Sequence, residues 1–468
     1  MRMFRPAAYK DEIEDQAIVK KQYQYFRIRV FYSMFIGYAF YYFTRKSFTF
    51  AMPALMSDLH FDKADLGIIA SIWAITYGLS KFISGVIGDR SNARTFMAFG
   101  LIVTGICNIF FGLSSSLYLF ALFWGLNGWF QGFGWPACAR LLTHWYSQSE
   151  RGRWWSMWNT SHNIGGAIIP IITAFFAQYY GWRSAMLFPG VVSIIMGFFL
   201  LNRLCDTPQS LGLPTIEKFR NDYPMKFAQE GKEQELSVKE ILFKYVLCNP
   251  YIWLLAVSYF FVYIIRIAIG DWSILYLVEQ KGYSQLQAGS IVFWFDIGGI
   301  FGSLAAGWAS DTVFSGKRVP ICIIFSLLIT CVLLFFGGFN EKAILVDSCL
   351  IFSAGFFIYG PQMLIGMAAA ELSHKKAAAT ASGFTGWVAY LGAAVAGYPF
   401  GKITQEFGWS GFFIALAFCG AVATMLLAPL WNVRSRDEGI FTQRDVEGKG
   451  EGEPIKVAED EETVEAVF

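Results

Sequence analysis

Charged residues are scarce in this chain. Asp, Glu, Lys and Arg together make up 15% of its 468 residues, whereas about 25% is typical of soluble domains. The formal net charge is only +2, which argues against a nucleic-acid partner, because such partners select strongly basic surfaces. The eight cysteines are scattered and form no C-x-x-C pair. We therefore expect neither a disulfide framework nor a metal site.

Two signatures of energy coupling are also missing. The stretch SGKR at 315–318 is not a phosphate-binding loop, because Asp311 stands in place of the first glycine and Arg318 in place of serine or threonine. This argues against ATP-driven transport. A proton relay would need several carboxylates within apolar segments, and the near candidates are only Asp271, Asp296 and Glu371. We expect no enzyme activity and no cofactor.

Apolar residues, in contrast, are abundant. They make up 55% of the chain, aromatic residues 18%, and the mean hydropathy is +0.44. Apolar stretches near 20 residues recur from Ile28 to Leu430, and each can cross about 30 Å of hydrocarbon as a helix. The N-terminus, MRMFRPAAYKDEIEDQ, is too charged for a cleaved signal peptide. The sequence predicts an all-α membrane protein in a lipid bilayer.

These stretches predict twelve transmembrane helices. Their approximate ranges are 29–51, 65–88, 95–115, 118–142, 155–178, 184–203, 250–270, 286–309, 319–338, 344–367, 378–401 and 411–431. The one long polar connection, Arg203–Lys244, separates six helices from six. We expect a cytoplasmic N-terminus (1–28), an N-terminal six-helix half (29–203), a cytoplasmic central loop (204–249), a C-terminal six-helix half (250–431) and a cytoplasmic acidic tail (432–468).

The short loops indicate the orientation in the membrane. Their lysines and arginines gather on the side of the two termini and the central loop, as in the pairs Arg90 and Arg94, or Lys317 and Arg318. By the positive-inside rule this side is cytoplasmic. We therefore expect a multi-pass protein of the cell inner membrane with both termini in the cytoplasm.

An internal repeat relates the two sets of helices. GVIGDRSNAR and GWASDTVFSGKR both have glycine four residues before aspartate, and Asp89 and Asp311 are 222 residues apart. Arg45 and Arg266, each within an apolar stretch, are 221 residues apart. Matched offsets are typical of two halves of the same topology, related by an axis along the membrane normal. Arg45 and Arg266 are then expected to face each other across a central cavity.

An arginine pair of this kind predicts an anion site. A charge within a spanning helix costs about 2.5–3.5 kcal/mol on insertion scales, so it needs a partner or a function. Two planar guanidinium groups can bind phosphoryl oxygens in bidentate fashion. The alternative is a purely structural pairing with Asp271 or Asp296; the matched positions in both halves favour phosphate.

Other polar residues in the same helices are candidates for substrate binding. His162 and Asn159 share one helix face, although a lone histidine is more often a packing residue. Mid-helix tyrosines can bond phosphate or sugar hydroxyls, and lysines can add positive potential; packing and snorkelling are the alternatives. These candidates are Tyr38, Tyr42, Tyr77, Tyr263, Tyr359, Tyr390, Lys46 and Lys81.

The repeated loops predict a gate on the cytoplasmic side. Asp89 and Asp311 stand beside basic residues, and ion pairs there could latch the two halves together. The predicted gating residues are Asp89, Arg90, Arg94, Asp311 and Arg318. Solvated loop charges are the alternative, since exposed pairs contribute only about 0–1 kcal/mol.

Several stretches together resemble the major facilitator superfamily and, more narrowly, its organophosphate:phosphate antiporter family. They include YYFTRKSF, GDRSNAR, WNTSHNIGGA, DTPQSLGLP, YIIRIAIGDW and YGPQMLIGMAAAELSHKKAA. The branch that they resemble most is that of the bacterial hexose phosphate transporters and sensors. The resemblance implies a major facilitator fold, phosphate binding by Arg45 and Arg266, and substrate recognition by His162. It implies no catalytic residue.

The sequence departs from one permease of the family, which has aspartate and lysine where this chain has Ser382 and Thr385. We retain both positions as candidates for substrate binding, but specificity cannot be copied. The expected function is uptake of a sugar phosphate, foremost glucose 6-phosphate, in exchange for inorganic phosphate by a monomer. The alternatives are a glucose-6-phosphate receptor that signals to a membrane sensor kinase, and a glycerol-3-phosphate antiporter.

Overall fold

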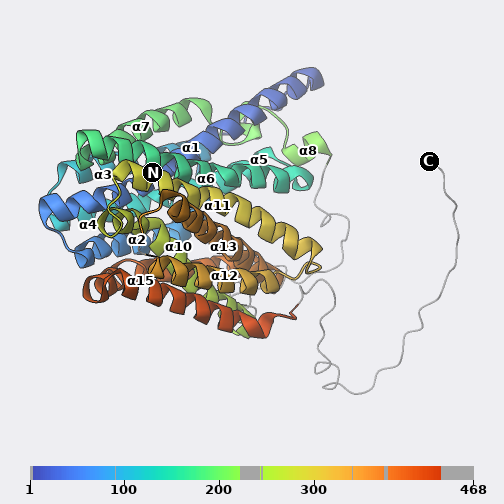
Figure 1. Cartoon of the computed structure of the whole chain (residues 1–468). Coiled ribbons are helices and arrows are strands. Elements are labelled where there is room, and N and C mark those ends of the chain that lie inside the picture. Colours follow the sequence, from blue (N-terminus) through green and yellow to red (C-terminus); the bar gives the residue numbers. More distant parts are fainter. Residues whose placement is uncertain are drawn as a thin grey trace, which may run out of the picture.

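The computed structural model describes residues 4–89, 91–221, 243, 246–339, 341–373 and 378–433, without the side chains of some helical residues. The first set of helices is α1 (Gln16–Leu59), α2 (Lys63–Asp89), α3 (Ala93–Leu113), α4 (Leu117–Gln131), α5 (Gly134–Trp145), α6 (Gln148–Tyr180) and α7 (Trp182–Arg203). The second is α10 (Pro250–Glu279), α11 (Gln285–Thr312), α12 (Val319–Gly338), α13 (Ile344–Glu371), α14 (Ala378–Val395) and α15 (Tyr398–Leu427). The long helices run side by side as one bundle (Figure 1).

Length and apolar composition support membrane spanning. Among the described residues, eight helical segments are long and apolar enough to cross a bilayer. One of them, Thr380–Leu430, contains both α14 and α15. The predicted all-α membrane fold is thus confirmed in its class, although α1, α2 and α4 are not among these eight segments.

The predicted fourth helix, 118–142, is broken in the structure. It becomes α4 and α5, separated at Gly132 and Phe133. Pro136 has no N–H to donate to the carbonyl of Gly132, and the hydroxyl of Ser84 donates to this oxygen instead, at 2.6 Å. The apolar pattern continues across the break, so periodicity alone could not reveal it.

The last two predicted helices also have different boundaries. The predicted helix 378–401 ends at Val395, where Gly397 comes close to α2: a Cβ on Gly67 would lie 2.7 Å from the Gly397 oxygen. The twelfth helix was predicted to begin at 411, but α15 begins at Tyr398 and is interrupted at Gly408, with φ 66° and ψ −171°. That backbone conformation is essentially restricted to glycine.

Small residues set the closest helix packing in the second half. On α11 and α13, a Cβ on Gly302 would lie 1.9 Å from the Phe356 oxygen, and one on Gly355 would lie 1.9 Å from the Phe295 oxygen. Such approaches are typical of membrane helices, where association depends on close packing. They hold α11 and α13 together as one unit beside the cavity described below.

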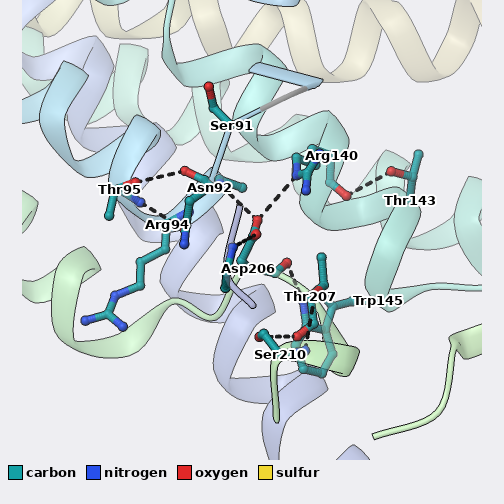
Figure 2. Close-up of polar contacts among 12 residues, drawn as sticks. Ser91, Asn92, Arg94, Thr95, Arg140, Thr143, Trp145, Asp206, Thr207 and Ser210 are labelled. Carbon is teal, nitrogen blue, oxygen red and sulfur yellow. Dashed lines mark hydrogen bonds and ion pairs between the residues drawn. The ribbon is translucent and has the colours of Figure 1, made fainter. Parts of the chain in front are cut away.

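A buried carboxylate fixes the segment after α7 to the first half. Asp206, 2% exposed, accepts hydrogen bonds from the backbone N–H of Ala93 at 2.9 Å and of Ala7 at 3.2 Å, and forms an ion pair with Arg140 at 3.3 Å. Figure 2 shows Asp206 between the start of α3 and the Arg140 side chain from α5. We call Asp206 with these three partners the Asp206 clasp.

The short helices that follow Asp206 also contact the first half. The Trp145 indole donates to the Asp206 carbonyl at 3.3 Å, and the ring of Tyr23 stacks on Phe219 at 4.1 Å. Phe219 belongs to α8 (Ile216–Arg220), which follows the 3-10 helix Pro208–Leu211. The segment 204–221 therefore packs on the first half.

The second half contains a fully buried ion pair. Lys281 lies 3.0 Å from Asp347, and both side chains have no exposed surface. Lys281 also donates to the carbonyl of Glu341 at 2.8 Å, and the Tyr283 hydroxyl donates to the other oxygen of Asp347 at 2.7 Å. This cluster fastens the end of α10 to the start of α13.

Candidate functional site

A small cavity lies between the two halves. Its walls come from α1, α2 and α4 of the first half and from α10, α11 and α13 of the second. The lining residues are Tyr42, Arg45, Lys46, Phe48, Thr49, Ala70, Trp73, Trp124, Arg266, Ile267, Asp271, Phe295 and Tyr359. Arg45 and Arg266, from opposite halves, thus reach one shared cavity.

Aromatic rings surround the guanidinium of Arg45. Its central carbon lies 4.6 Å from the ring centre of Trp73, 4.9 Å from that of Tyr77 and 5.2 Å from that of Tyr42. Ring faces attract cations, and the attraction grows where water is excluded. These rings stabilise the charge, and the guanidinium also donates a long hydrogen bond, 3.5 Å, from Nη1 to the Tyr42 hydroxyl.

Arg266 has a similar environment. It is 7% exposed, and its guanidinium carbon lies 5.0 Å from the ring centre of Tyr359 and 5.7 Å from that of Tyr263. Its Nε is buried and has no hydrogen-bond partner. A buried donor without a partner costs free energy, so an anion that accepts from it would be stabilised.

The nearby carboxylates bind other groups. Asp271 lies 3.4 Å from Lys46, so this ion pair connects α10 with α1. Asp296 accepts a 2.5 Å hydrogen bond from the Tyr359 hydroxyl. Within the described residues, neither Arg45 nor Arg266 forms an ion pair with a carboxylate. The alternative expectation is that Asp271 or Asp296 pairs with the two arginines. In the structure these carboxylates contact Lys46 and Tyr359.

The predicted tyrosines and lysines surround the cavity to different extents. Tyr42 and Tyr359 line it together with Lys46. The ring of Tyr390 lies 4.9 Å from that of Tyr77 and 5.3 Å from that of Tyr263, which connects α14 with α2 and α10. The Lys81 ammonium lies 5.4 Å from the Tyr390 ring centre.

The remaining substrate candidates lie farther from the cavity wall. His162 packs its ring 5.6 Å from Tyr42, and Tyr38 packs 4.8 Å from Trp158. The Ser382 hydroxyl donates to the Gly366 carbonyl and the Thr385 hydroxyl to the Ala381 carbonyl, both at 3.0 Å. These two residues are not part of the cavity lining. The Asn159 side chain lies outside the described part of the chain.

The gating residues that can be described stay within one half. Arg318 pairs with Asp311 and with Glu371, at 3.2 Å from the latter, and all three residues belong to the second half. The Arg94 side chain is exposed and extends away from the Asp206 clasp (Figure 2). Arg90 and the Asp89 side chain lie outside the described residues. A latch between the halves at these positions remains a prediction.

Besides the Lys46–Asp271 pair at the cavity, polar contacts join the halves at the helix ends opposite to these loops. Lys63 pairs with Glu279 at 2.9 Å, and Gln405 donates to Asp62 at 3.1 Å. Ser71 donates to the Ala394 carbonyl at 2.6 Å and accepts from the Tyr398 N–H at 2.8 Å. We call these contacts the far-end contacts. Sequence reasoning missed them, because it sought a gate only where basic residues were dense.

Sequence reasoning also missed Trp73, whose ring is the nearest to Arg45. A tryptophan in an apolar helix gives no polar signal, so attention went to tyrosines and charges. Its spacing did contain a hint, since Trp73 precedes Tyr77 by four residues on the same face of α2 and the two rings stack at 5.0 Å.

Comparison with known proteins finds relatives that match most of the chain. A probable hexose phosphate transport protein of Chlamydia trachomatis is 60% identical over 440 residues, 92% of this chain and 96% of that protein. The membrane sensor protein UhpC of Escherichia coli is 47% identical over 426 residues, 91% of this chain and 96% of that protein. A solved bacterial homolog of the human lysosomal transporter Spinster has a TM-score of 0.67 at 13% identity, covering 87% and 95% of the two chains.

The family assignment follows from the match along the chain. The sequence model of the Major Facilitator Superfamily matches residues 34–397, which run from within α1 to just after α14. The organophosphate:phosphate antiporter resemblance is confirmed by the identity to the probable hexose phosphate transport protein and to UhpC. The family match and the relative named as a transport protein indicate a transporter and not an enzyme, and this chain belongs to the Major Facilitator Superfamily.

Proposed function

We propose that this protein exchanges a sugar phosphate, foremost glucose 6-phosphate, for inorganic phosphate. The observation that carries the proposal is the shared cavity in which Arg45 and Arg266 approach from opposite halves with no carboxylate partner in the described residues. A phosphoryl dianion can accept from both guanidinium groups and neutralise both charges. The name of the Chlamydia relative supports a hexose phosphate as the substrate.

The site also suggests how movement depends on cargo. Without an anion, closing the cavity brings two positive charges together in a medium of low dielectric constant, where repulsion is strong. A bound phosphoryl group removes this repulsion and stabilises the closed intermediate. A ligand shifts the balance between the open and closed states only if it binds one of them more tightly. Phosphate and sugar phosphate would both stabilise the closed intermediate, so they would be transported alternately in opposite directions.

We further propose that the far-end contacts close the external side. Both termini and the basic loops are expected in the cytoplasm, so the ends joined by Lys63 and Glu279 would face outward. The protein would lie in the inner membrane and work as a monomer with two rocking halves. The structure would then represent a state whose cavity is shielded from the external medium.

The test of exchange uses purified protein in liposomes. Vesicles loaded with phosphate are expected to take up labelled glucose 6-phosphate, whereas vesicles without internal phosphate are not. An imposed pH gradient is expected not to replace internal phosphate. Robust uptake into phosphate-free vesicles, driven by protons alone, would establish symport and contradict exchange. Comparing uptake of glycerol 3-phosphate separates the two substrate classes.

A second candidate function is that of a receptor. It is favoured by the 47% identity to a protein named as a membrane sensor, and its partner would be a membrane sensor kinase. The same liposomes distinguish the two functions. Saturable binding of glucose 6-phosphate, with no phosphate-dependent uptake at protein densities where binding is measurable, would favour the receptor.

The far-end closure leads to a steric prediction. A Cβ on Gly67 would lie 2.7 Å from the Gly397 backbone oxygen, so Gly67→Leu is expected to hold these ends apart and abolish exchange. Accessibility is measured in a cysteine-free background that carries Thr49→Cys, a substitution in the cavity wall. This cysteine is expected to react with an impermeant thiol reagent from outside several-fold faster when Gly67→Leu is present than when it is absent. Gly338→Leu is the control, because nothing lies within 4 Å of that Cβ position. Unchanged labelling with normal exchange in Gly67→Leu would refute the closure.

A further inference from the structure

The first half contains a network of buried polar side chains that has no role in the exchange mechanism proposed above. Asn127 and Asn108 have no exposed surface, and neither do Ser47 and Thr104. The Asn127 amide nitrogen donates to the Asn108 side-chain oxygen at 3.0 Å, and Asn108 donates to the Ser47 hydroxyl at 2.8 Å. Polar groups within spanning helices are costly and tend to be functional, so this network needs an explanation.

Asn127 is the centre of the network. Its amide nitrogen also approaches the carbonyl oxygens of Thr44 at 3.4 Å and Thr104 at 3.3 Å. Through these contacts α4 is tied to α1 and α3. Thr44 directly precedes Arg45, so one branch of the network ends at the backbone of the arginine-bearing turn.

The oxygen of Asn127 has a different partner. It accepts a 3.0 Å hydrogen bond from the Trp73 indole N–H. The same indole ring lies 4.6 Å from the Arg45 guanidinium carbon, the shortest ring distance for that arginine. Asn127 therefore contacts the Thr44 carbonyl, directly before Arg45, and holds the Trp73 ring that lies against the Arg45 guanidinium.

The second half does not repeat this arrangement. The 221-residue offset that relates Arg45 to Arg266 places Ala268 opposite Ser47 and Ile329 opposite Asn108, and both are fully buried. There the ring beside the arginine, Tyr359, is held by Asp296. The asparagine network is thus not a requirement of the six-helix fold, which points to a specific role in the first half.

We propose that Asn127 is a positioning residue for phosphate binding, acting through the Trp73 indole on the guanidinium of Arg45. This inference rests on the proposed function, because it assigns a role at the same anion site. Losing the hydrogen bond between Asn127 and Trp73 is expected to have a modest net effect on stability. It is also expected to let the Trp73 ring change its orientation beside Arg45. The guanidinium must stay aligned for bidentate binding.

The test measures phosphate self-exchange in liposomes as a function of phosphate concentration. Asn127→Ala is expected to raise the KM for phosphate about tenfold, equivalent to about 1.4 kcal/mol, with a maximal rate within about twofold of wild type. Trp73→Phe, which loses the indole N–H, is expected to raise the KM similarly. Because Asn127 acts through Trp73, Asn127→Ala is expected to add little in the Trp73→Phe background.

A matched variant separates positioning from general destabilisation. Gln131 lies one turn along α4, is 4% exposed and donates to the Tyr41 carbonyl and the Thr44 hydroxyl, both at 2.9 Å. Gln131→Ala is expected to lower stability without a comparable rise in KM. An unchanged KM in Asn127→Ala, or fully additive effects of the two substitutions, would overturn the positioning role while leaving the exchange function intact. If Asn127→Ala does not fold, an unchanged KM in Trp73→Phe overturns it. Absence of phosphate exchange by the wild-type protein would overturn both proposals.

Discussion

Arg45→Lys and Arg266→Lys are each expected to abolish exchange of phosphate and sugar phosphate while the protein still inserts and folds. Lysine keeps the positive charge but loses the planar fork that binds two phosphoryl oxygens. It is also a poorer partner for the Trp73 and Tyr359 rings, which lie 4.6 Å and 5.0 Å from the guanidinium carbons. The measurement is phosphate self-exchange in liposomes, with the amount of folded protein determined by size-exclusion chromatography.

The chain contains a suitable control for this substitution. The Arg183 guanidinium lies 4.5 Å from the Trp182 ring centre and donates to the Ser115 hydroxyl at 2.9 Å, away from the cavity lining. Arg183→Lys is expected to retain exchange. If either Arg45→Lys or Arg266→Lys exchanges phosphate at a rate close to wild type, the assignment of the anion site is wrong.

The largest expected effect on stability comes from the buried ion pair of the second half. Asp347→Ala leaves the Lys281 ammonium buried without its counter-charge and removes the acceptor of the Tyr283 hydroxyl. Breaking a buried pair by removing one partner costs about 3–5 kcal/mol. We expect a large drop in the melting temperature in detergent, measured by the loss of helical circular dichroism.

An exposed ion pair gives the comparison. Lys402 and Glu406 lie one helical turn apart on α15 at 3.8 Å, with side chains 55% and 53% exposed. Glu406→Ala is expected to change stability by only about 0–1 kcal/mol. Equal melting temperatures for Asp347→Ala and Glu406→Ala would show that the Lys281 cluster does not stabilise the fold.

The parts of the site that could be predicted from the sequence were those with a conspicuous polar signal. An arginine in an apolar stretch stands out, and its repetition after 221 residues pointed to a shared cavity; both Arg45 and Arg266 line it. Trp73 and Asn127 could not be found in this way. Their roles depend on a hydrogen bond between two helices, and the two residues are 54 positions apart in the sequence.

The fold was predictable in class but not in every boundary, for local reasons. The break between α4 and α5 depends on how Ser84 replaces the hydrogen bond that Pro136 cannot donate. The far-end contacts depend on how closely α2 approaches α14 and α15, which a single sequence does not specify. Ser382 and Thr385 were candidates by comparison with a permease, yet their hydroxyls donate to backbone carbonyls.

The Asp206 clasp has a consequence for the mechanics of the connection between the halves. Since Asp206 binds α3, α5 and the N-terminal segment, we expect the described residues up to Asn221 to move together with the first half. The end of α7 is therefore not where the chain leaves the first half, because the segment 204–221 still packs on it. For anyone who inserts a reporter domain or a protease site after α7, an insertion next to Asp206 is expected to pull this carboxylate away from the start of α3 and to destabilise the first half.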